Sequence, residues 1–507
     1  MARFWHGVSL PLALLLLGPA PLLRPQPAAA QANRQETARE PQLRVLLVEG
    51  PSATVAAPTA AGLRLRDRQG RPLLELAGTQ PLQLRLRAGW LELRPVPVQA
   101  DVSAMGASAA GAAAAGAVAA RALAAGPVPA GAGSAEAQPL LAATELWLEP
   151  IPIAASTSAD GVLVLQQRRY RGRLQVIPAG SGLQVINHVP LETYLPSVVG
   201  SEMPASWPQQ ALRAQAVAAR TYALKGRRPE AGFDLKATVA SQVYRGVEAE
   251  TPSTREAVAA TRGLVLTYGQ GLINAVFHSS SGGSTESSGE LWPQQLPYLV
   301  SVPDFDQDSP VRQWRQPLAP DLLAKAFAEI GGVRSIEVVA TTSTGRVRQA
   351  RVVGPAGQLL LSGAALRNRL GLRSTWVRFE LEVPEAAAGI NSGALPPAPP
   401  PPLPAFSLPA AAFSADPGAA PVPLLLPQWV AVGRGFGHGI GMSQWGALAM
   451  ARRGDSFDAI LSHYYRGAQL RPYRELASAT AAGPGSWRAQ ISDGDAKVVA
   501  VGPRSRP

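Results

Sequence analysis

One carboxylate, Glu202, has the sequence position that acid–base chemistry would need. It lies in the segment GSEMPASWPQQALRAQAVAARTYAL (200–224), in a short predicted turn just before a strongly predicted helix. An acid held by rigid neighbours can donate and accept a proton during a reaction. A carboxylate before a helix can equally do no more than stabilise the helix dipole. This segment alone leaves both interpretations open.

The helix after Glu202 is predicted from its start and stop signals. Ser206 and Gln209 fit a capping box, Pro208 is tolerated in a first turn, and Lys225 with Gly226 closes the helix. Between them, Leu and Ala residues recur at helical spacing. Because Pro204 biases the residue before it toward an extended conformation, we expect Glu202 to lie outside the helix.

Four sequence blocks carry a resemblance to a known family. They are LETYLPSVVGSEMP (191–204), ALRAQAVAARTYAL (211–224), HSSSGGSTESSGELW (278–292) with PYLVSVPD (297–304), and GRGFGHGIGMSQWGALAMA (433–451) with HYYRGAQL (463–470). In this order they resemble the family of stage II sporulation protein D and the amidase enhancer LytB. The resemblance covers roughly residues 160 to 475, and more loosely the predicted strands from Leu43 onward.

The resemblance implies a lytic transglycosylase acting on peptidoglycan, with the Glu of the EMP motif, here Glu202, as the catalytic acid. Such an enzyme needs no second carboxylate, because the 6-hydroxyl of the muramic acid attacks and closes an anhydro ring. Apolar neighbours Val198, Val199 and Met203 would keep Glu202 protonated near neutral pH. Glu192 is the alternative acid, and its other expected role is structural.

Six further residues are predicted to contact the substrate. The loop after His278 exposes hydroxyls and backbone amides to a sugar, and either Glu286 or Glu290 is a possible second carboxylate if the enzyme uses water. Simple loop structure is the alternative for this segment. The predicted substrate-binding residues are Arg220, His278, Ser280, Glu286, His438 and Gln444.

Five alternating glycines from Gly433 to Gly441 precede a helix predicted at 442–453. They do not match GxGxxG and no P-loop lysine follows, so nucleotide binding is not indicated. The helix amides and His438 are candidates to bind acetamido or lactyl oxygens of peptidoglycan. Alternatively, the glycines only allow close packing. His188 and His463 are expected to be structural.

The chain has no cysteine, so it has neither a disulfide nor a thiolate ligand. The resemblance implies that family members can carry zinc on a His and two cysteines near His278. Since only the His is present here, we expect no cofactor and no metal site. A Ser–His hydrolase is not favoured either, because GxSxG is absent.

The net charge of +12 is spread along the chain and is not concentrated in one basic stripe with aromatic residues. Nucleic-acid binding is therefore not expected. An anionic cell wall is the simpler partner.

The first 32 residues are typical of a secretory signal. Arg3 supplies positive charge, Val8 to Leu17 the apolar stretch, and Ala30-Gln31-Ala32 a cleavage site. We expect an exported protein of the periplasm or cell wall, which contacts the membrane only if this segment stays uncleaved.

We expect an α+β fold in which two sequence-separated pieces form one catalytic unit. The expected segments are a signal peptide (1–32), a β-rich N-terminal region (33–100), a flexible Ala/Gly-rich insertion (101–143), the main part of the family-like domain (144–384), a Pro/Ala-rich linker (385–427), its C-terminal part (428–475) and a flexible tail (476–507). The final part must then fold back onto the earlier one.

The sequence therefore favours an exported lytic transglycosylase. The alternative is a wall-binding protein without catalysis that stimulates a cell-wall amidase, which would then be its partner. A zinc amidase is a more distant alternative, for want of a ligand set.

Overall fold

The computed structural model describes residues 40–57, 62–96, 120–122, 139–151, 161–382 and 427–474. The predicted signal peptide, the tail, and all but one residue of the predicted linker lie outside these ranges. Two units are distinguished, Met1–Pro41 and Gln42–Pro507, and every element below belongs to the second. Helices and strands both contribute substantially, so the predicted α+β class is confirmed.

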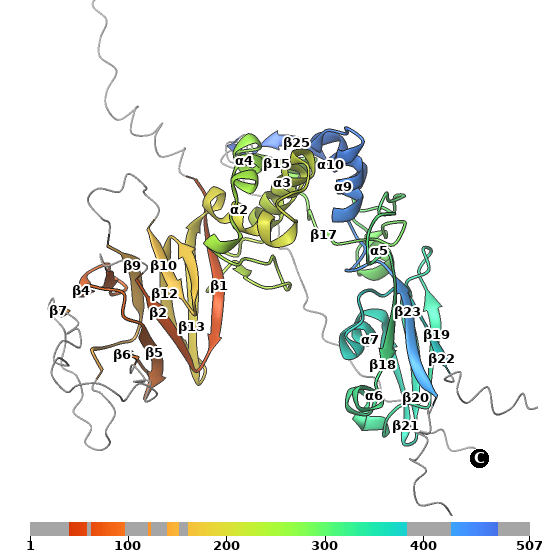
Figure 1. Cartoon of the computed structure of the whole chain (residues 1–507), viewed down its shortest axis with the longest axis horizontal. Coiled ribbons are helices and arrows are strands. Elements are labelled where there is room, and N and C mark those ends of the chain that lie inside the picture. The colour runs from red at the N-terminus through yellow and green to blue at the C-terminus, as the bar shows by residue number, and fades with distance from the viewer. Residues whose placement is uncertain are drawn as a thin grey trace, which may run out of the picture. The chain divides into compact units, whose positions relative to one another are not determined.

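The N-terminal half is built from two antiparallel-rich sheets. Their strands are β1 (Gln42–Gly50), β2 (Ser52–Ala56), β3 (Leu63–Arg66), β4 (Pro72–Leu76), β5 (Leu82–Arg87), β6 (Trp90–Pro95), β7 (Ala120–Ala122), β8 (Leu141–Ala143), β9 (Leu146–Pro150), β10 (Val162–Leu165), β11 (Arg168–Arg171), β12 (Arg173–Ala179), β13 (Gly182–Pro190) and β14 (Leu235–Lys236). One sheet has the order β14-β1-β13-β12-β9-β3-β4-β7 and the other β11-β10-β2-β5-β6-β8. Figure 1 shows β1, β13 and β12 side by side.

Alternation of apolar and polar residues explains why these strands pair as they do. Leu146 and Leu148 of β9 face the same core as Leu174 of β12, while Leu84 and Leu93 face it from the second sheet. Successive side chains of a strand point to opposite faces, so each Leu-x-Leu run places a continuous apolar face inward. The two sheets pack against each other through these faces.

Two strands fall within the predicted Ala/Gly insertion at 101–143. The backbone of β7 pairs with β4, and β8 pairs with β6. The regular strand pattern thus resumes at Leu141, three residues before the predicted boundary. Residues 101–119 and 123–138 lie outside the described part of the chain.

A helical layer follows the sheets. It contains α2 (Leu191–Glu202), α3 (Gln209–Lys225), η1 (Val247–Ala249), α4 (Pro252–Ala260), α9 (Gln444–Arg452) and α10 (Phe457–Tyr464), with β15 (Leu264–Tyr268), β16 (Gly271–Leu272) and β25 (Gln469–Pro472) beside it. Helix α3 is central and contacts α2, α4, α9 and α10. None of the helices in the described ranges is long and apolar enough to cross a membrane.

One prediction about the position of Glu202 is wrong. Glu202 is the last residue of α2 and does not lie in a turn between elements. The sequence 191–199 buries residues at helical spacing, and this burial outweighs the cost of Pro196 inside the helix. The prediction that Met203 is extended is confirmed, with φ −128° and ψ 144°.

The predicted capping box at the start of α3 is also not formed. Pro208 occupies the N-cap position, and no side chain there accepts a capping hydrogen bond. Gln209 instead donates to the carbonyl of Ser253, with Nε2 and O 3.1 Å apart. This contact ties the start of α3 to α4.

The C-terminal segment folds back onto earlier elements, as predicted. Strand β23 (Gln428–Arg434) lies between β18 (Gln313–Leu318) and β22 (Val377–Glu382), and β24 (Met442–Ser443) pairs with β17 (Phe277–His278). Strand β25 pairs with β15. In Figure 1 this segment is blue among green elements.

A second, smaller core is formed by α6 (Pro320–Ala326), η2 (Ala328–Ile330), β19 (Ser335–Thr341), β20 (Val347–Gly354), β21 (Gly357–Ser362) and α7 (Gly363–Leu370), together with β18, β22 and β23. Helix α5 (Ser288–Leu291) belongs to the main core, against which Leu291 packs. The sequence predicts one helix from Asp321 to Ile330, whereas the structure has α6 followed by the single 3₁₀ turn η2. Helices α7 and α10 were not predicted from the sequence.

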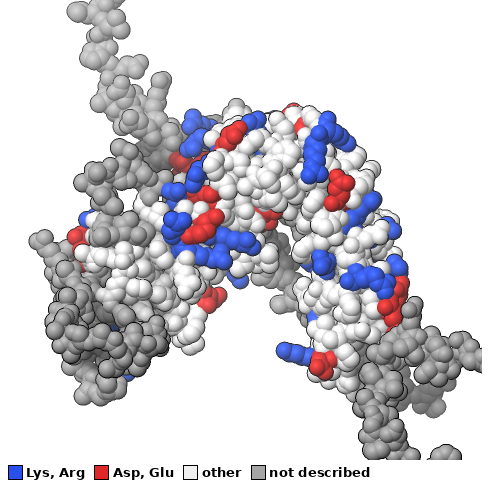
Figure 2. All heavy atoms as spheres, in the orientation of Figure 1, with Lys and Arg blue, Asp and Glu red and all other residues white. Residues whose placement is uncertain are grey.

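Charged residues on the described surface are largely interspersed. Figure 2 shows basic side chains beside acidic ones on the face in view. Exposed or half-exposed ion pairs of the described residues include Arg169–Glu248 and Arg348–Glu290. The positive charge therefore does not form one continuous stripe on this face.

A buried ion pair joins the helical layer. Arg220 of α3 binds Glu192 of α2 through two contacts, Nη2 to Oε2 at 2.7 Å and Nε to Oε1 at 2.8 Å. The same guanidinium donates to the carbonyls of Val258 and Leu264, on α4 and β15. Arg220 has no exposed side-chain surface. Its position thus gives it a role in packing in place of the predicted contact with substrate.

We expect Arg220→Gln to lower the free energy of unfolding by about 3–5 kcal/mol, because the Glu192 carboxylate would stay buried without its cation. Urea unfolding monitored by circular dichroism measures the change. Arg351→Gln is the matched control, because Arg351 and Glu337 are exposed, at 41% and 60%, and should contribute less than about 1 kcal/mol. Equal losses in the two variants would contradict this role of Arg220.

Candidate functional site

Glu202 is partly buried at the C-terminal end of α2. Its Oε1 accepts a hydrogen bond from the backbone N–H of Val243 at 2.9 Å, and the side-chain amide of Gln444 donates a second one. Burial raises the pKa of Glu202, while these two hydrogen bonds and the charge of Arg245 oppose the rise. Glu202 is thus a carboxyl group that retains its proton to higher pH than an exposed glutamate does.

Gln444 reaches Glu202 from the first residue of α9. Ser443 caps this helix by accepting a hydrogen bond from the N–H of Gly446 at 3.3 Å. The Gln444 amide also lies 3.5 Å from Oε1 of Gln215, a buried residue of α3. Three helices therefore bring Glu202, Gln215 and Gln444 together, and two of these residues are predicted site residues.

Two tryptophans close in the chain to this group contact each other, and they were missed in the sequence. Trp207 follows Glu202 in the turn before α3, and Trp445 follows Gln444. Their ring centroids are 5.3 Å apart at an interplanar angle of 68°, and both side chains are partly exposed. An aromatic ring offers a rigid apolar face with a polar edge, which suits the apolar face of a sugar. Both tryptophans lie in the segments singled out above, but only the fold shows that they are neighbours.

His278 and His438 form a pair whose ring centroids are 5.3 Å apart. His278 is buried and donates through Nδ1 to the carbonyl of Ile440 at 3.1 Å. His438 accepts through Nδ1 from the N–H of the same residue, also at 3.1 Å. Burial lowers the pKa of His278 well below its usual value and that of His438 to about 4. Both rings are therefore neutral at physiological pH.

The residues present do not fit a zinc site. Nε2 of His278 is buried and has no hydrogen-bond partner in the described part of the chain. However, the described residues contain no group of three or more His, Asp and Glu side chains that could hold a metal. We therefore assign no reaction step to a metal.

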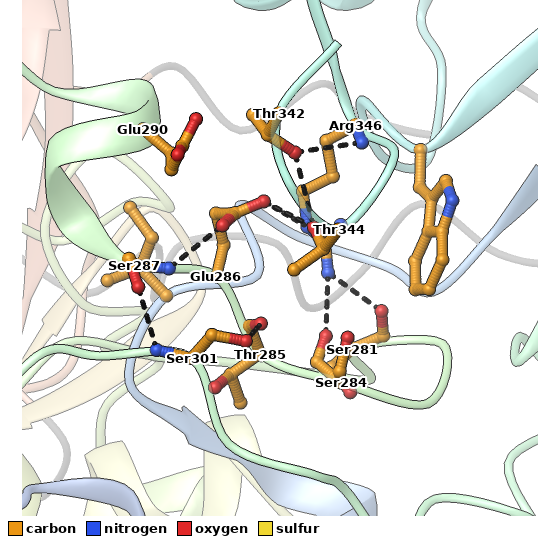
Figure 3. Close-up of polar contacts among 12 residues, drawn as sticks. Ser281, Ser284, Thr285, Glu286, Ser287, Glu290, Ser301, Thr342, Thr344 and Arg346 are labelled. Carbon is orange, nitrogen blue, oxygen red and sulfur yellow. Dashed lines mark hydrogen bonds and ion pairs between the residues drawn. The ribbon is translucent and has the colours of Figure 1, made fainter.

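Glu286 belongs to a buried polar cluster with Arg346 (Figure 3). Glu286 accepts hydrogen bonds from the hydroxyl of Thr344 and the N–H of Ser287, and it lies 3.9 Å from Nε of Arg346. Arg346 donates to the carbonyls of Ser281 and Ser284 at 2.8 and 3.2 Å. Its burial lowers its pKa to about 10, against the attraction of Glu286 and two aspartates. The cluster fixes the loop at 278–292 against the β19–β20 hairpin.

Ser280 is buried as well, and its hydroxyl donates to Asp306 at 2.5 Å. Ser281 donates to Asp304 at the same distance. Burial, and next the nearby Asp306, raises the pKa of Asp304. Because Ser280, His278 and Glu286 are all buried, their observed contacts are structural ones. Glu290 is more exposed and pairs with Arg348 at 3.3 Å.

The alternating glycines serve close packing. Gly435, Gly437, Gly439 and Gly441 have positive φ, a conformation that disfavours other residues. A Cβ on Gly439 would lie 2.4 Å from Cζ of Arg346, and one on Gly437 would lie 2.6 Å from Cβ of His278. The backbone must approach these buried side chains closely, as the alternative interpretation of the glycines expects.

The remaining two described histidines make ordinary structural contacts. His188 donates to Oε1 of Gln175 at 2.8 Å, and burial lowers its pKa to about 4. His463 donates to the carbonyl of Pro303 at 2.8 Å.

Comparison with known proteins points to one family. The family model described as "Stage II sporulation protein" matches residues 179–268, which include α2, α3 and Glu202. The chain is 31% identical over 308 residues to a protein of Bacillus subtilis (strain 168) named "Amidase enhancer", a match that covers 55% of this chain and 40% of that protein.

Two relatives named "Stage II sporulation protein D" are matched over more of their length. The one from Bacillus amyloliquefaciens is 30% identical over 308 residues, 56% of this chain and 75% of the relative. The one from Bacillus subtilis (strain 168) is 30% identical over 307 residues, 57% of this chain and 76% of the relative.

We expect Gln444→Leu to raise the pKa of Glu202 further, because the variant removes a donor that stabilises the charged carboxylate. The ¹³C NMR shift of the Glu202 carboxyl, assigned with Glu202→Gln, measures the titration. Gln316→Leu is the control, since Gln316 donates to Leu370 in the smaller core and should leave the titration unchanged. An unchanged or lower pKa in Gln444→Leu would refute this coupling.

Proposed function

The chain belongs to the family of stage II sporulation protein D and the amidase enhancer, and from that premise we propose that it is an exported lytic transglycosylase of peptidoglycan. The observation that supports the proposal most directly is Glu202, a partly exposed carboxyl with a raised pKa, which bonds to Gln444, the residue before one of two contacting tryptophans. Export rests on the signal-like sequence of the first 32 residues.

In the proposed reaction Glu202 acts first as an acid and then as a base. It donates its proton to the oxygen that bridges two sugars, so that the bond from this oxygen to the anomeric carbon of muramic acid breaks. The 6-hydroxyl oxygen of the same muramic acid then bonds to the anomeric carbon. Its proton passes to the Glu202 carboxylate, which restores the acid. The products are a free sugar end and a 1,6-anhydro ring.

A reaction with a single carboxyl agrees with the state of the other acids near the site. Most glycosidases place a second carboxylate across the scissile bond, to activate water or to act as a nucleophile. Here Glu192 is bound to Arg220, and Glu286 is enclosed with Arg346 and Thr344. Neither carboxylate is available to activate water or to bond to a sugar. The 6-hydroxyl of muramic acid can attack without a second carboxylate.

The pair Trp207 and Trp445 provides the proposed sugar platform. Glu202 and Gln444 share a hydrogen bond. Trp445 directly follows Gln444 in the chain, and Trp207 lies in the turn that follows Glu202. A sugar stacked on either ring would lie beside the acid, so binding and proton transfer share one place.

The second candidate function is stimulation of a cell-wall amidase without cleavage of glycan. It is favoured by the relative named "Amidase enhancer", although the matched region covers only 40% of that protein. In this case the two tryptophans would bind glycan and Glu202 would have no chemical role.

We expect Glu202→Gln to reduce the release of anhydromuropeptides from purified peptidoglycan by at least about 100-fold, because glutamine keeps the acceptor for Val243 but has no proton to transfer. Liquid chromatography with mass spectrometry measures these products. Glu256→Gln, at an exposed glutamate, is the control and should keep the normal rate. A fully active Glu202→Gln variant would refute the role. If the unsubstituted protein releases no product but speeds an added amidase, the second candidate is correct.

We expect Trp445→Ala to weaken binding to insoluble peptidoglycan about fivefold, since an aromatic contact contributes about 1 kcal/mol beyond buried area. Co-sedimentation with insoluble peptidoglycan measures the binding. The assay uses the Glu202→Gln background, so that the protein does not digest the peptidoglycan. Trp90→Ala is the matched control, because Trp90 is 47% exposed on β6 and lies outside the proposed platform. The same loss from both substitutions would argue against a specific platform.

A further inference from the structure

A cavity of about 420 Å³ lies where the N-terminal sheets meet the segment 237–245. Leu47 and Val48 of β1 line one side, and Val239 and Val243 line the other. Arg168 and Arg245 also line it, and both side chains are exposed. Its volume lies in the range of sites for small molecules, roughly 300–1,000 Å³. The cavity thus combines apolar walls with two cations.

The two arginines differ from their neighbours in forming no ion pair within the described part of the chain. Arg169 pairs with Glu248 at 2.9 Å and Arg171 with Glu250 at 2.9 Å. Within the described ranges of the chain, neither Arg168 nor Arg245 takes part in an ion pair or a side-chain hydrogen bond. Two unpaired guanidinium groups at one cavity favour an anion, and arginine suits a carboxylate because its planar fork can donate two parallel hydrogen bonds.

A strained turn positions the first of these arginines. Gln166 and Gln167 have φ values of 47° and 69°, a left-handed conformation that Asn and Gly usually supply in two-residue hairpins. The turn is held by the N–H of Gln166, which donates to the carbonyl of Thr54 at 2.9 Å. Gln166 lines the cavity and Arg168 follows the turn directly. Backbone strain of this kind concentrates at binding sites, where the surrounding structure maintains it.

The cavity is connected to Glu202 through Val243. This residue lines the cavity, and its N–H donates to the Glu202 carboxylate at 2.9 Å. Arg245, two residues later, acts electrostatically on the same carboxylate. A group held in the cavity would therefore belong to the sugar whose glycosidic oxygen Glu202 protonates, or to its neighbour.

We propose that this cavity is a subsite for carboxylates carried on the lactyl arm of muramic acid, bound by Arg168 and Arg245. The proposal rests on peptidoglycan being the substrate, as inferred above. The carboxylate has two sources, the free lactyl group of a glycan stripped of peptide or the acidic stem peptide of an unstripped one. The apolar walls would contact the methyl groups of the lactyl arm or of the peptide.

Equilibrium binding to the Glu202→Gln protein tests the subsite without any cleavage. Isothermal titration calorimetry is done with N-acetylmuramic acid, which has a free lactyl carboxylate, and with its tripeptide derivative. N-acetylglucosamine, which lacks the lactyl arm, is the matched control ligand. We expect at least one of the first two ligands to bind more tightly than the control. The Arg168→Gln/Arg245→Gln double substitution should then weaken that binding at least tenfold.

A second double variant, Arg351→Gln/Arg378→Gln, removes two exposed arginines of the smaller core region and should leave binding unchanged. If the Arg168→Gln/Arg245→Gln variant loses binding only to N-acetylmuramic acid, the carboxylate comes from stripped glycan. If it loses binding only to the tripeptide derivative, the carboxylate comes from the stem peptide. Equal affinity of all three ligands, or no effect of the double variant, would overturn the subsite. Because this assay needs no turnover, its result is separate from whether anhydro products form. Arg168 and Arg245 are both exposed, so the thermal unfolding midpoint of their double variant should equal that of the unsubstituted protein. This comparison checks that the variant is folded.

Discussion

The ion pair between Arg220 and Glu192 is the interaction on which the helical layer depends. It joins α2 and α3, and the same guanidinium binds carbonyls of α4 and β15. Burying two charges is costly unless each charged group has several hydrogen-bond partners, and both Arg220 and Glu192 have them. Because α2 is held along its length, its last residue, Glu202, has a defined position relative to the segment 237–245 and to α9. The candidate acid is therefore placed by a contact at the opposite end of its helix.

Much of the fold follows from local patterns. The β-rich N-terminal region and the helices α3 and α9 were predicted close to their observed places. Helix α2 was missed, although the spacing of its buried residues is helical. The capping box failed because Gln209 makes a tertiary contact instead. These errors share a cause, since burial against distant elements outweighed a local preference.

The candidate site was predicted less completely than the fold. The sequence singled out Glu202 and Gln444, and the structure brings them together. It did not single out Trp207 and Trp445, because their contact depends on how α3 and α9 pack. The polar residues His278, Ser280 and Glu286 suggested a sugar-binding loop. In the structure all three are buried and contact other residues of the protein: His278 bonds to Ile440, Ser280 to Asp306 and Glu286 to Thr344. Polar groups in a low-dielectric interior need such partners.

The return of the C-terminal segment has a consequence for the timing of maturation. Gln215 and Gln444 are in contact although 229 residues separate them in the chain, and β23, β24 and β25 each complete a sheet begun much earlier. Contacts of such long range form late in folding, because loop closure must come first. The residues around Glu202 are therefore assembled only after the end of the domain has been synthesised and docked. A chain that is still being synthesised has the acid without its surroundings, so the candidate site exists only in the completed fold.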